Sequence, residues 1–209
     1  MIISFLNQKG GVGKTTLAVH FAMGLSIAGA KVLLIDADPQ GSALDWAGSR
    51  EGDAPFPVIG LPKPSLHRET PKHIPNYDYI VIDGPPRVNE LARSAIMASD
   101  LVLVPVQPSP YDVWAAKEII DLLAEASSFK EKLKAAFVIN RKIVNTAIGR
   151  DVADSLAEYP IPVLNSQVCQ RVSFAESAAQ GLTVLEIDPG GTGSQEIKSL
   201  ITEVKKLYS

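Results

Sequence analysis

Residues 8–16, with the sequence QKGGVGKTT, combine glycines, lysines and threonines in a spacing suited to a phosphate chain. Glycines let the backbone approach phosphate oxygens and turn several N–H groups toward them. The spacing places Lys14 on the β- and γ-phosphates of a nucleotide and offers the Thr15 hydroxyl to Mg²⁺. A simple strand-to-helix turn would need neither side chain. We therefore predict a nucleotide site formed by Gly10, Gly11, Val12, Gly13, Lys14, Thr15 and Thr16.

The loop departs from the standard pattern G-x-x-x-x-G-K-[ST], because Gln8 stands where the first glycine would be. A second lysine, Lys9, lies at the mouth of the loop. Two unpaired cations near a metal ion repel each other unless a polyanion fills the space between them. Lys9 therefore suits a triphosphate, and a solvated surface lysine is the alternative interpretation.

Two apolar runs further along the chain end in carboxylates. Asp36 and Asp38 follow residues 33–35, and their spacing points both side chains to the same side of a strand. Asp83 ends residues 79–83 and is followed by Gly84. We expect Asp83 to hold Mg²⁺ through water or through Thr15, and the Gly84 N–H to reach the γ-phosphate. Capping of the following turn is the alternative role for Asp36 and Asp38.

Asn140 ends another apolar run, and its amide offers both a donor and an acceptor to the edge of a base. The guanine-reading pattern N-K-x-D is absent, because Arg141, Lys142 and Ile143 follow. Formation of a turn at the strand end is the alternative role for this asparagine.

The elements that position these residues alternate along the chain. Near-continuous apolar runs predict strands of a parallel sheet at residues 2–6, 32–35, 79–82, 101–106 and 135–139, with weaker candidates at 162–164 and 183–185. Helical spacing predicts helices at residues 14–28, 89–98, 113–126, 146–157 and 194–207. Six prolines in residues 49–75 indicate a surface excursion with an edge strand at 56–61. The expected fold is α/β, a mostly parallel twisted sheet with helices on both faces, in a single domain spanning residues 1–209.

Composition narrows the classes of function. Twenty Lys and Arg against 23 Asp and Glu give a net charge of -3, so binding to nucleic acid would need a local patch. Cys169 is the single cysteine, which excludes an internal disulfide and a cysteine-ligated cluster held by one chain, and suggests a reducing cytoplasm. We expect no signal peptide, and no apolar run approaches the roughly 20 residues of a membrane-spanning helix.

The motifs K-G-G-x-G-K-T-T at residues 9–16 and D-x-D-P-Q at residues 36–40 resemble those of the ParA/MinD family of deviant Walker ATPases, especially its short ParA-type partition ATPases. The resemblance implies a P-loop NTPase fold with ATP and Mg²⁺ as cofactors. It implies that Lys9 reaches the partner's ATP in a nucleotide-sandwich homodimer. It further implies that Asp38 orients or activates the attacking water, that Asp36 supports the metal shell, and that Asn140 recognises adenine.

The same resemblance suggests partners beyond the nucleotide. Such ATPases bind nucleoid DNA without sequence preference as ATP dimers, and a ParB-like or other cargo adaptor protein stimulates their slow hydrolysis. The cargo is a plasmid, a chromosome or a protein assembly, and the expected location is cytoplasmic and nucleoid-associated. Residues 106–112 resemble the loop of dimer and polymer contacts, with a rigid loop capped by Asp112 as the alternative. Candidate DNA-binding cations, which would otherwise form a solvated surface, are Arg171, Lys198, Lys205 and Lys206.

Two other functions share these features. A MinD-like ATPase would act at a membrane surface, but the last helix has an apolar stripe of the width expected for core packing, and no basic, aromatic-rich tail follows Tyr208 and Ser209. We therefore expect no stable membrane association. A metabolic ATP-dependent enzyme would use the same loop, but Lys9 and the D-x-D-P-Q motif argue against that alternative.

Overall fold

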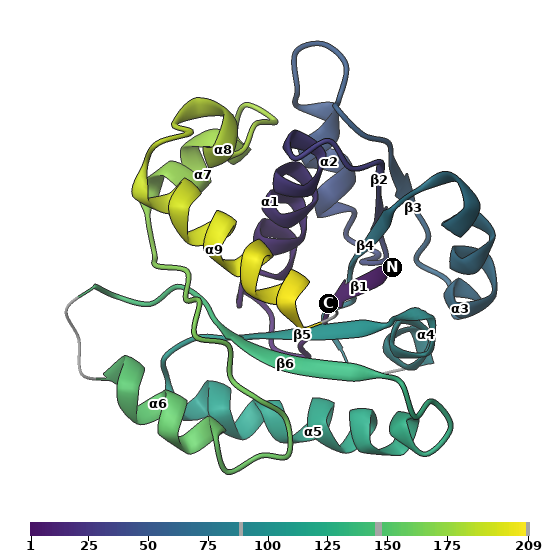
Figure 1. Cartoon of the computed structure of the whole chain (residues 1–209), viewed down its shortest axis with the longest axis vertical. Helices are drawn as coiled ribbons and strands as arrows, with labels where there is room; N and C mark the ends of the chain where they lie inside the picture. Colours follow the sequence, from purple (N-terminus) through teal and green to yellow (C-terminus); the bar gives the residue numbers. More distant parts are fainter. Residues whose placement is uncertain (88–89, 145–147, 208–209) are drawn as a thin grey trace.

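The structure is a computed structural model that describes residues 1–87, 90–144 and 148–207 (Figure 1). Six strands form one parallel sheet in the order β3-β2-β4-β1-β5-β6. Their bounds are β1 Ile2–Phe5, β2 Val32–Asp36, β3 Val58–Gly60, β4 Tyr79–Asp83, β5 Leu101–Val106 and β6 Lys134–Ile139. The strands are apolar along their length because both faces of the sheet are covered, which confirms the predicted α/β class.

Helices cover the two faces of the sheet, as Figure 1 shows for α1 and α9 on one side and α5 on the other. The first layer contains α1 Lys14–Ile27, α2 Ser42–Gly48, α7 Val172–Ala178, α8 Val184–Ile187 and α9 Thr192–Lys206. The second contains α3 Leu66–Glu69, α4 Glu90–Ala98, α5 Pro110–Ser127 and α6 Ile148–Leu156, and a 3₁₀ helix, η1, spans Thr70–Asn76.

Alternate residues of the strands supply the two cores. In β1, Ile3 and Phe5 pack with the α1 and α9 layer, whereas Ile2 packs with the α4 and α5 layer. This alternation follows from the two-residue side-chain period of a strand. The parallel register aligns Asp36 of β2 with Asp83 of β4, so the two carboxylates end adjacent strands at the same edge of the sheet. That edge is where ligands bind in open α/β sheets.

The structure corrects several predicted boundaries. Residues 183–185 are not a strand, because Thr183 is the N-cap of α8 and forms a capping box with Glu186. Residues 162–164 contribute an isolated bridge from Val163 to Phe137 rather than a strand. The edge strand expected at 56–61 is shortened to β3, and α9 begins two residues before the predicted start. Residue 89, residues 146–147 and residues 208–209, on which parts of the predictions fall, lie outside the described residues.

Within the described part of the chain, no helix has the combination of length and apolar character that crossing a membrane requires. The apolar stripe of α9 is buried, as expected for a core-packing helix, and contributes Ile197, Leu200, Ile201 and Val204 to the first core.

Candidate functional site

The glycine-rich loop connects β1 to α1 and has the geometry of an anion site. Gly11 and Gly13 adopt positive φ values of 79° and 89°, which glycine tolerates without steric cost. A Cβ on Gly13 would lie 2.3 Å from Asn140 Nδ2, so this position also lacks space for a side chain. In the described chain, the backbone N–H groups of residues 10–16 donate to no other protein group. With the N-terminus of the 14-residue α1, they form a set of donors for phosphate oxygens.

A cavity of about 430 Å³ opens above this loop. Its lining brings together loop residues and Asp38, as the motif spacing predicted, and also includes His20, Trp46 and Arg141. The predicted residues that line it are Gly10, Gly11, Gly13, Lys14, Thr15, Thr16 and Asp38. Val12 was also predicted for the site but does not line the cavity, because its side chain is fully buried in the protein.

Lys14 lies beneath the cavity with only 7% of its surface exposed. Burial lowers the pKa of its ammonium group, while the nearby Asp83 and Asp38 carboxylates oppose that decrease. A phosphate chain above Lys14 would supply further negative charge and favour the protonated form. The environment of Lys14 therefore suits an anionic ligand.

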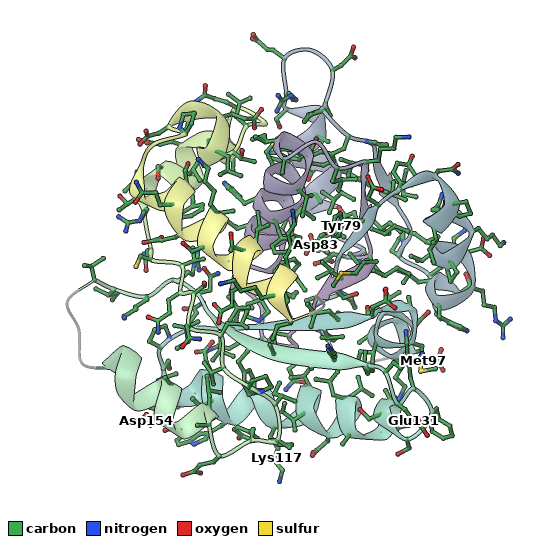
Figure 2. The ribbon with its side chains drawn as sticks, in the orientation of Figure 1. Tyr79, Asp83, Met97, Lys117, Glu131 and Asp154 are labelled. Carbon is green, nitrogen blue, oxygen red and sulfur yellow. The ribbon has the colours of Figure 1, made fainter. Side chains whose placement is uncertain are left out.

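Asp83, which Figure 2 labels, ends β4. It is completely buried, and neither of its carboxylate oxygens has a hydrogen-bond partner in the described chain. Burial raises the pKa of Asp83 to about 7; Asp36 and Asp38 add to the rise, whereas Thr15 and Lys14 oppose it. A buried carboxylate without donors is a suitable partner for a hard cation or its water shell. These residues therefore fit Mg²⁺, with Asp83 and the Thr15 hydroxyl on the protein side.

The described residues contain no group of three or more His, Cys, Asp or Glu side chains arranged to hold a metal ion. Mg²⁺ characteristically keeps several waters and binds through one or two protein ligands together with substrate phosphates. The site is thus suited to a metal that arrives with a nucleotide rather than to a resident metal held by the protein alone.

Asp36 makes the contacts of a helix cap. Its Oδ2 accepts hydrogen bonds from the N–H groups of Ala43 (2.9 Å) and Leu44 (3.0 Å) in the first turn of α2, and its Oδ1 accepts from Asp38 N (3.1 Å). Burial raises the pKa of Asp36, and these backbone donors oppose the rise. The alternative capping role is therefore observed, and support of the metal shell stays a prediction. Within the described ranges, the only hydrogen bond that the Asp38 side chain accepts is from Gln40 N, at 2.9 Å, and Asp38 remains at the cavity.

Lys9 is oriented away from the cavity above its own loop. Its Nζ lies 2.5 Å from Asp112 Oδ2 in the first turn of α5. The Lys9 side chain is 38% exposed, but Asp112 is 1% exposed and its Oδ1 has no partner among the described residues. The assumption that Lys9 is unpaired was therefore wrong for the isolated chain, because a buried carboxylate holds it. Asp112 uses its side chain for this ion pair and makes no cap hydrogen bond.

Gly84 and Asn140 have structural contacts that differ from their expected roles. The Gly84 N–H donates to Phe5 O at 3.1 Å, so in this conformation it is not available to a γ-phosphate. A Cβ on Gly84 would lie 2.1 Å from Leu6 Cδ2, which gives the glycine a packing role. Asn140 Nδ2 donates to Val12 O at 2.7 Å, and its side chain lines a second cavity adjoining the first. Recognition of adenine by Asn140 stays a prediction.

The candidate DNA-binding cations lie outside the 430 Å³ cavity. Arg171 is half-buried and forms two hydrogen bonds to Glu196, with Nη2 to Oε1 at 2.5 Å and Nε to Oε2 at 3.3 Å. The other three candidates, Lys198, Lys205 and Lys206, are exposed on α9. Lys205 lies over the ring of Tyr79, with Nζ 5.8 Å from the centroid, so part of this helix face packs on β4.

His20 and Trp46 are among the residues that line the cavity without having been predicted to belong to the site. Thr16 O contacts His20 Nδ1 at 2.7 Å, and Val184 N donates to His20 Nε2 at 3.1 Å, so this histidine joins the loop to α8. Burial lowers the pKa of His20 to about 4. Trp46 donates from Nε1 to Leu182 O at 3.0 Å and joins α2 to the segment before α8. No spacing signal identifies the contacts to Val184 and Leu182, because they connect residues 164 and 136 positions apart.

Comparisons with known proteins agree with this geometry. The model of the CobQ/CobB/MinD/ParA nucleotide binding domain family matches residues 3–184. The "maintenance of carboxysome distribution protein A" of Halothiobacillus neapolitanus is 33% identical over 210 residues, covering 97% of this chain and 95% of the relative. The sporulation initiation inhibitor protein Soj of Bacillus subtilis is 28% identical over 249 residues, covering 97% of each chain.

A solved structure also has the same fold. Cobyrinic acid a,c-diamide synthase from Mycobacterium smegmatis, with a bound ATP analog and magnesium, matches with a TM-score of 0.82 and 18% identity. The match covers 100% of this chain and 95% of that protein. At this level of identity the likeness establishes the fold, and the site residues must supply the argument for function.

Proposed function

Because this chain belongs to the CobQ/CobB/MinD/ParA nucleotide-binding family, whose ParA/MinD members are ATPases, we propose that it is a ParA-type ATPase that pairs around ATP. In the ATP state, two copies face each other across their glycine-rich loops and bind nucleoid DNA. A cargo-bound adaptor protein then stimulates hydrolysis and separates the copies. Cargo is positioned by repeating this cycle.

The position of Lys9 is the observation that carries the proposal. Lys9 belongs to the loop, yet its ammonium bonds Asp112 and does not line the cavity above its own loop. A second lysine at the triphosphate must then come from another copy. In a twofold-symmetric pair, each copy supplies the same residue to the other. Both nucleotide sites would thus be completed by one pairing event.

The Lys9–Asp112 pair also supports a requirement for triphosphate. If Lys9 leaves, the Asp112 carboxylate is left buried without its cation, and an uncompensated buried charge is strongly destabilising. A partner nucleotide with enough negative charge offsets this cost by accepting Lys9 in charge-assisted hydrogen bonds. We therefore expect ATP to pair the copies and ADP to leave Lys9 on Asp112.

Hydrolysis is assigned to the residues around the cavity. Asp38 lines it with few competing contacts, which supports the role of orienting the attacking water. Lys14 and the free N–H groups of the loop would bind the phosphates. Bound Mg²⁺, held by Asp83 and the Thr15 hydroxyl, would neutralise charge that develops on the phosphate oxygens. Because these groups include no evident strong general base other than Asp38, basal hydrolysis is expected to be slow.

Binding to DNA is assigned to the cations of α9. Lys198 and Lys205 are seven positions apart on α9 and lie on the same exposed side of the helix. Pairing of two copies would double this positive surface, and the resulting binding would weaken steeply with salt. Relatives of this chain include a carboxysome-distribution protein and the chromosome-partitioning ATPase Soj of Thermus thermophilus, so a protein assembly and a chromosome are the two kinds of cargo that we expect.

Light scattering tests the proposed pairing. The protein with ATP and Mg²⁺ is expected to double in mass, whereas the protein with ADP remains single. Lys9→Ala is expected to bind ATP but to stay single. The matched control is Lys117→Ala, which removes an exposed lysine from the outer side of α5 (Figure 2). Pairing of the Lys9→Ala protein at the same ATP concentration as wild type would refute the role of Lys9.

A further inference from the structure

Two side chains outside the glycine-rich loop converge on one of its carbonyl groups. Gln107 Nε2, just after β5, donates to Gly11 O at 2.9 Å. Arg141 Nη1, just after β6, donates to the same oxygen at 2.6 Å. Asn140 holds the next carbonyl, that of Val12. Three donors from the ends of two neighbouring strands therefore hold two successive peptide groups of the loop.

Because the peptide bond is planar, hydrogen bonds that hold these two carbonyl groups also orient the N–H groups of the anion site. In a trans peptide, the C=O and N–H bonds point in opposite directions. A donor that fixes the Gly11 carbonyl therefore also fixes the Val12 N–H, which points away from that donor. The bond from Asn140 to the Val12 carbonyl does the same for the Gly13 N–H. Gly11 and Gly13 have positive φ values, and N–H groups that converge in this way form an anion-binding nest.

The backbone of Arg141 supports a functional reason for its contact. Among the described residues, Arg141 is the sole non-glycine residue with a positive φ, at 54°. An arginine in this conformation is less stable than a glycine would be, because its Cβ crowds the backbone. Strained residues of this kind persist where the surrounding structure uses them, and they cluster at ligand sites. Arg141 also lines both cavities that adjoin the loop.

We propose that Gln107 and Arg141 are positioning residues for the nucleotide, which jointly hold the Gly11 carbonyl and so direct the loop N–H groups toward the α- and β-phosphates. This inference rests on the proposed nucleotide site and extends it to residues outside the loop. Because both side chains hold one oxygen, either can keep the loop in place when the other is removed.

Calorimetric binding of ADP and ATP with Mg²⁺ tests this arrangement in Gln107→Leu, Arg141→Gly and the double variant. Each single variant is expected to lose less than about fivefold in affinity, and the double variant at least about fiftyfold, since a hydrogen bond to a charged group is worth about a factor of 10 or more. ADP and ATP are expected to weaken by equal factors. The control Lys142→Ala removes the neighbouring cation, whose Nζ bonds Gln167 Oε1 rather than the loop, and is expected to bind as wild type does.

Two further measurements separate positioning from a general structural role. Arg141→Gly is expected to melt no lower than wild type, because glycine relieves the unfavourable φ. In the nucleotide-free double variant, ¹⁵N relaxation is expected to show lower order parameters at the Val12 and Gly13 amides. The inference is overturned if the affinity loss of the double variant equals the product of the two single losses. It is also overturned if the affinity for ATP falls while that for ADP does not, or if these order parameters do not change. Failure of wild type to bind nucleotide would instead refute the proposed function, and the relaxation data would still decide whether the loop is held.

Discussion

Replacing Asp83 with asparagine is predicted to change the pH dependence of stability in the nucleotide-free protein. Burial raises the pKa of Asp83 from 3.8 to about 7 in the folded chain. Between these values the folded state binds more protons than the unfolded state, so stability falls as pH rises. A difference of about 3 pKa units at about 1.4 kcal/mol each gives an upper limit of about 4 kcal/mol. Asp83→Asn removes this titration.

A second buried group acts in the opposite direction and determines how the experiment must be analysed. The pKa of His20 is lowered from 6.5 to about 4, so its contribution to stability increases as pH rises through this window. The two effects partly cancel in the wild-type protein below pH 6.5. The difference between wild type and Asp83→Asn isolates the carboxylate, and between pH 6.5 and 7.5 the decrease due to Asp83 is no longer masked.

Urea unfolding at half-unit steps from pH 4 to 8, in the presence of EDTA, measures this difference. The free energy of unfolding of wild type, relative to Asp83→Asn, is expected to fall by up to about 4 kcal/mol across the range. Since a buried asparagine also has a pH-independent cost, the slope with pH is the test rather than the absolute stability. Parallel profiles for the two proteins would refute the conclusion that Asp83 is an unpaired, desolvated carboxyl group.

Three further predictions concern His20, Asp112 and Arg50. The stability of wild type relative to His20→Gln is expected to increase between pH 4 and 6.5, and a constant difference between the two proteins in the same urea titrations would contradict this. Asp112→Asn removes the carboxylate that holds Lys9, so scattering titrations should show pairing at an ATP concentration about tenfold lower, as a change of about 1.4 kcal/mol implies; an unchanged or higher requirement would argue against the account. Arg50→Ala breaks the 2.5 Å ion pair with Glu186 that joins the segment after α2 to α8, and is expected to destabilise the protein by about 1–3 kcal/mol in urea. Equal stability of this variant and wild type would show that the connection contributes nothing.

The features that could be predicted from the sequence are those encoded over a few adjacent positions. The glycine-rich loop carries its chemistry within nine residues, and the five long strands are continuous apolar runs, so both were found. The short helices α2, α7 and α8 span only four to seven residues, which is too short for a clear helical period. For α8, the pair of Thr183 and Glu186 was a usable capping signal.

Contacts between distant segments explain most of the remaining differences. Asn140 was predicted to recognise the base, and its bond to Val12 could not be foreseen because it depends on how closely β6 approaches the loop. Gly84 was correctly located at the end of β4, but its packing against Leu6 follows from the neighbouring β1. The Lys9 to Asp112 pair joins residues 103 positions apart. Local spacing carries no information on such distances, so residue types at the site were predictable while several of their partners were not.

The central claim is that Lys9 acts across a pair of chains, and mixing two inactive variants tests it most directly. Lys9→Ala retains Asp38, and Asp38→Asn retains Lys9. In a mixed pair, one site has its own Asp38 and receives Lys9 from the partner, whereas the other site lacks both. Equal mixing of the two variants is therefore predicted to raise ATP hydrolysis above that of either variant alone, up to the limit of about a quarter of the wild-type rate that random pairing of a twofold assembly would give. A mixture no more active than the separate variants would contradict the account.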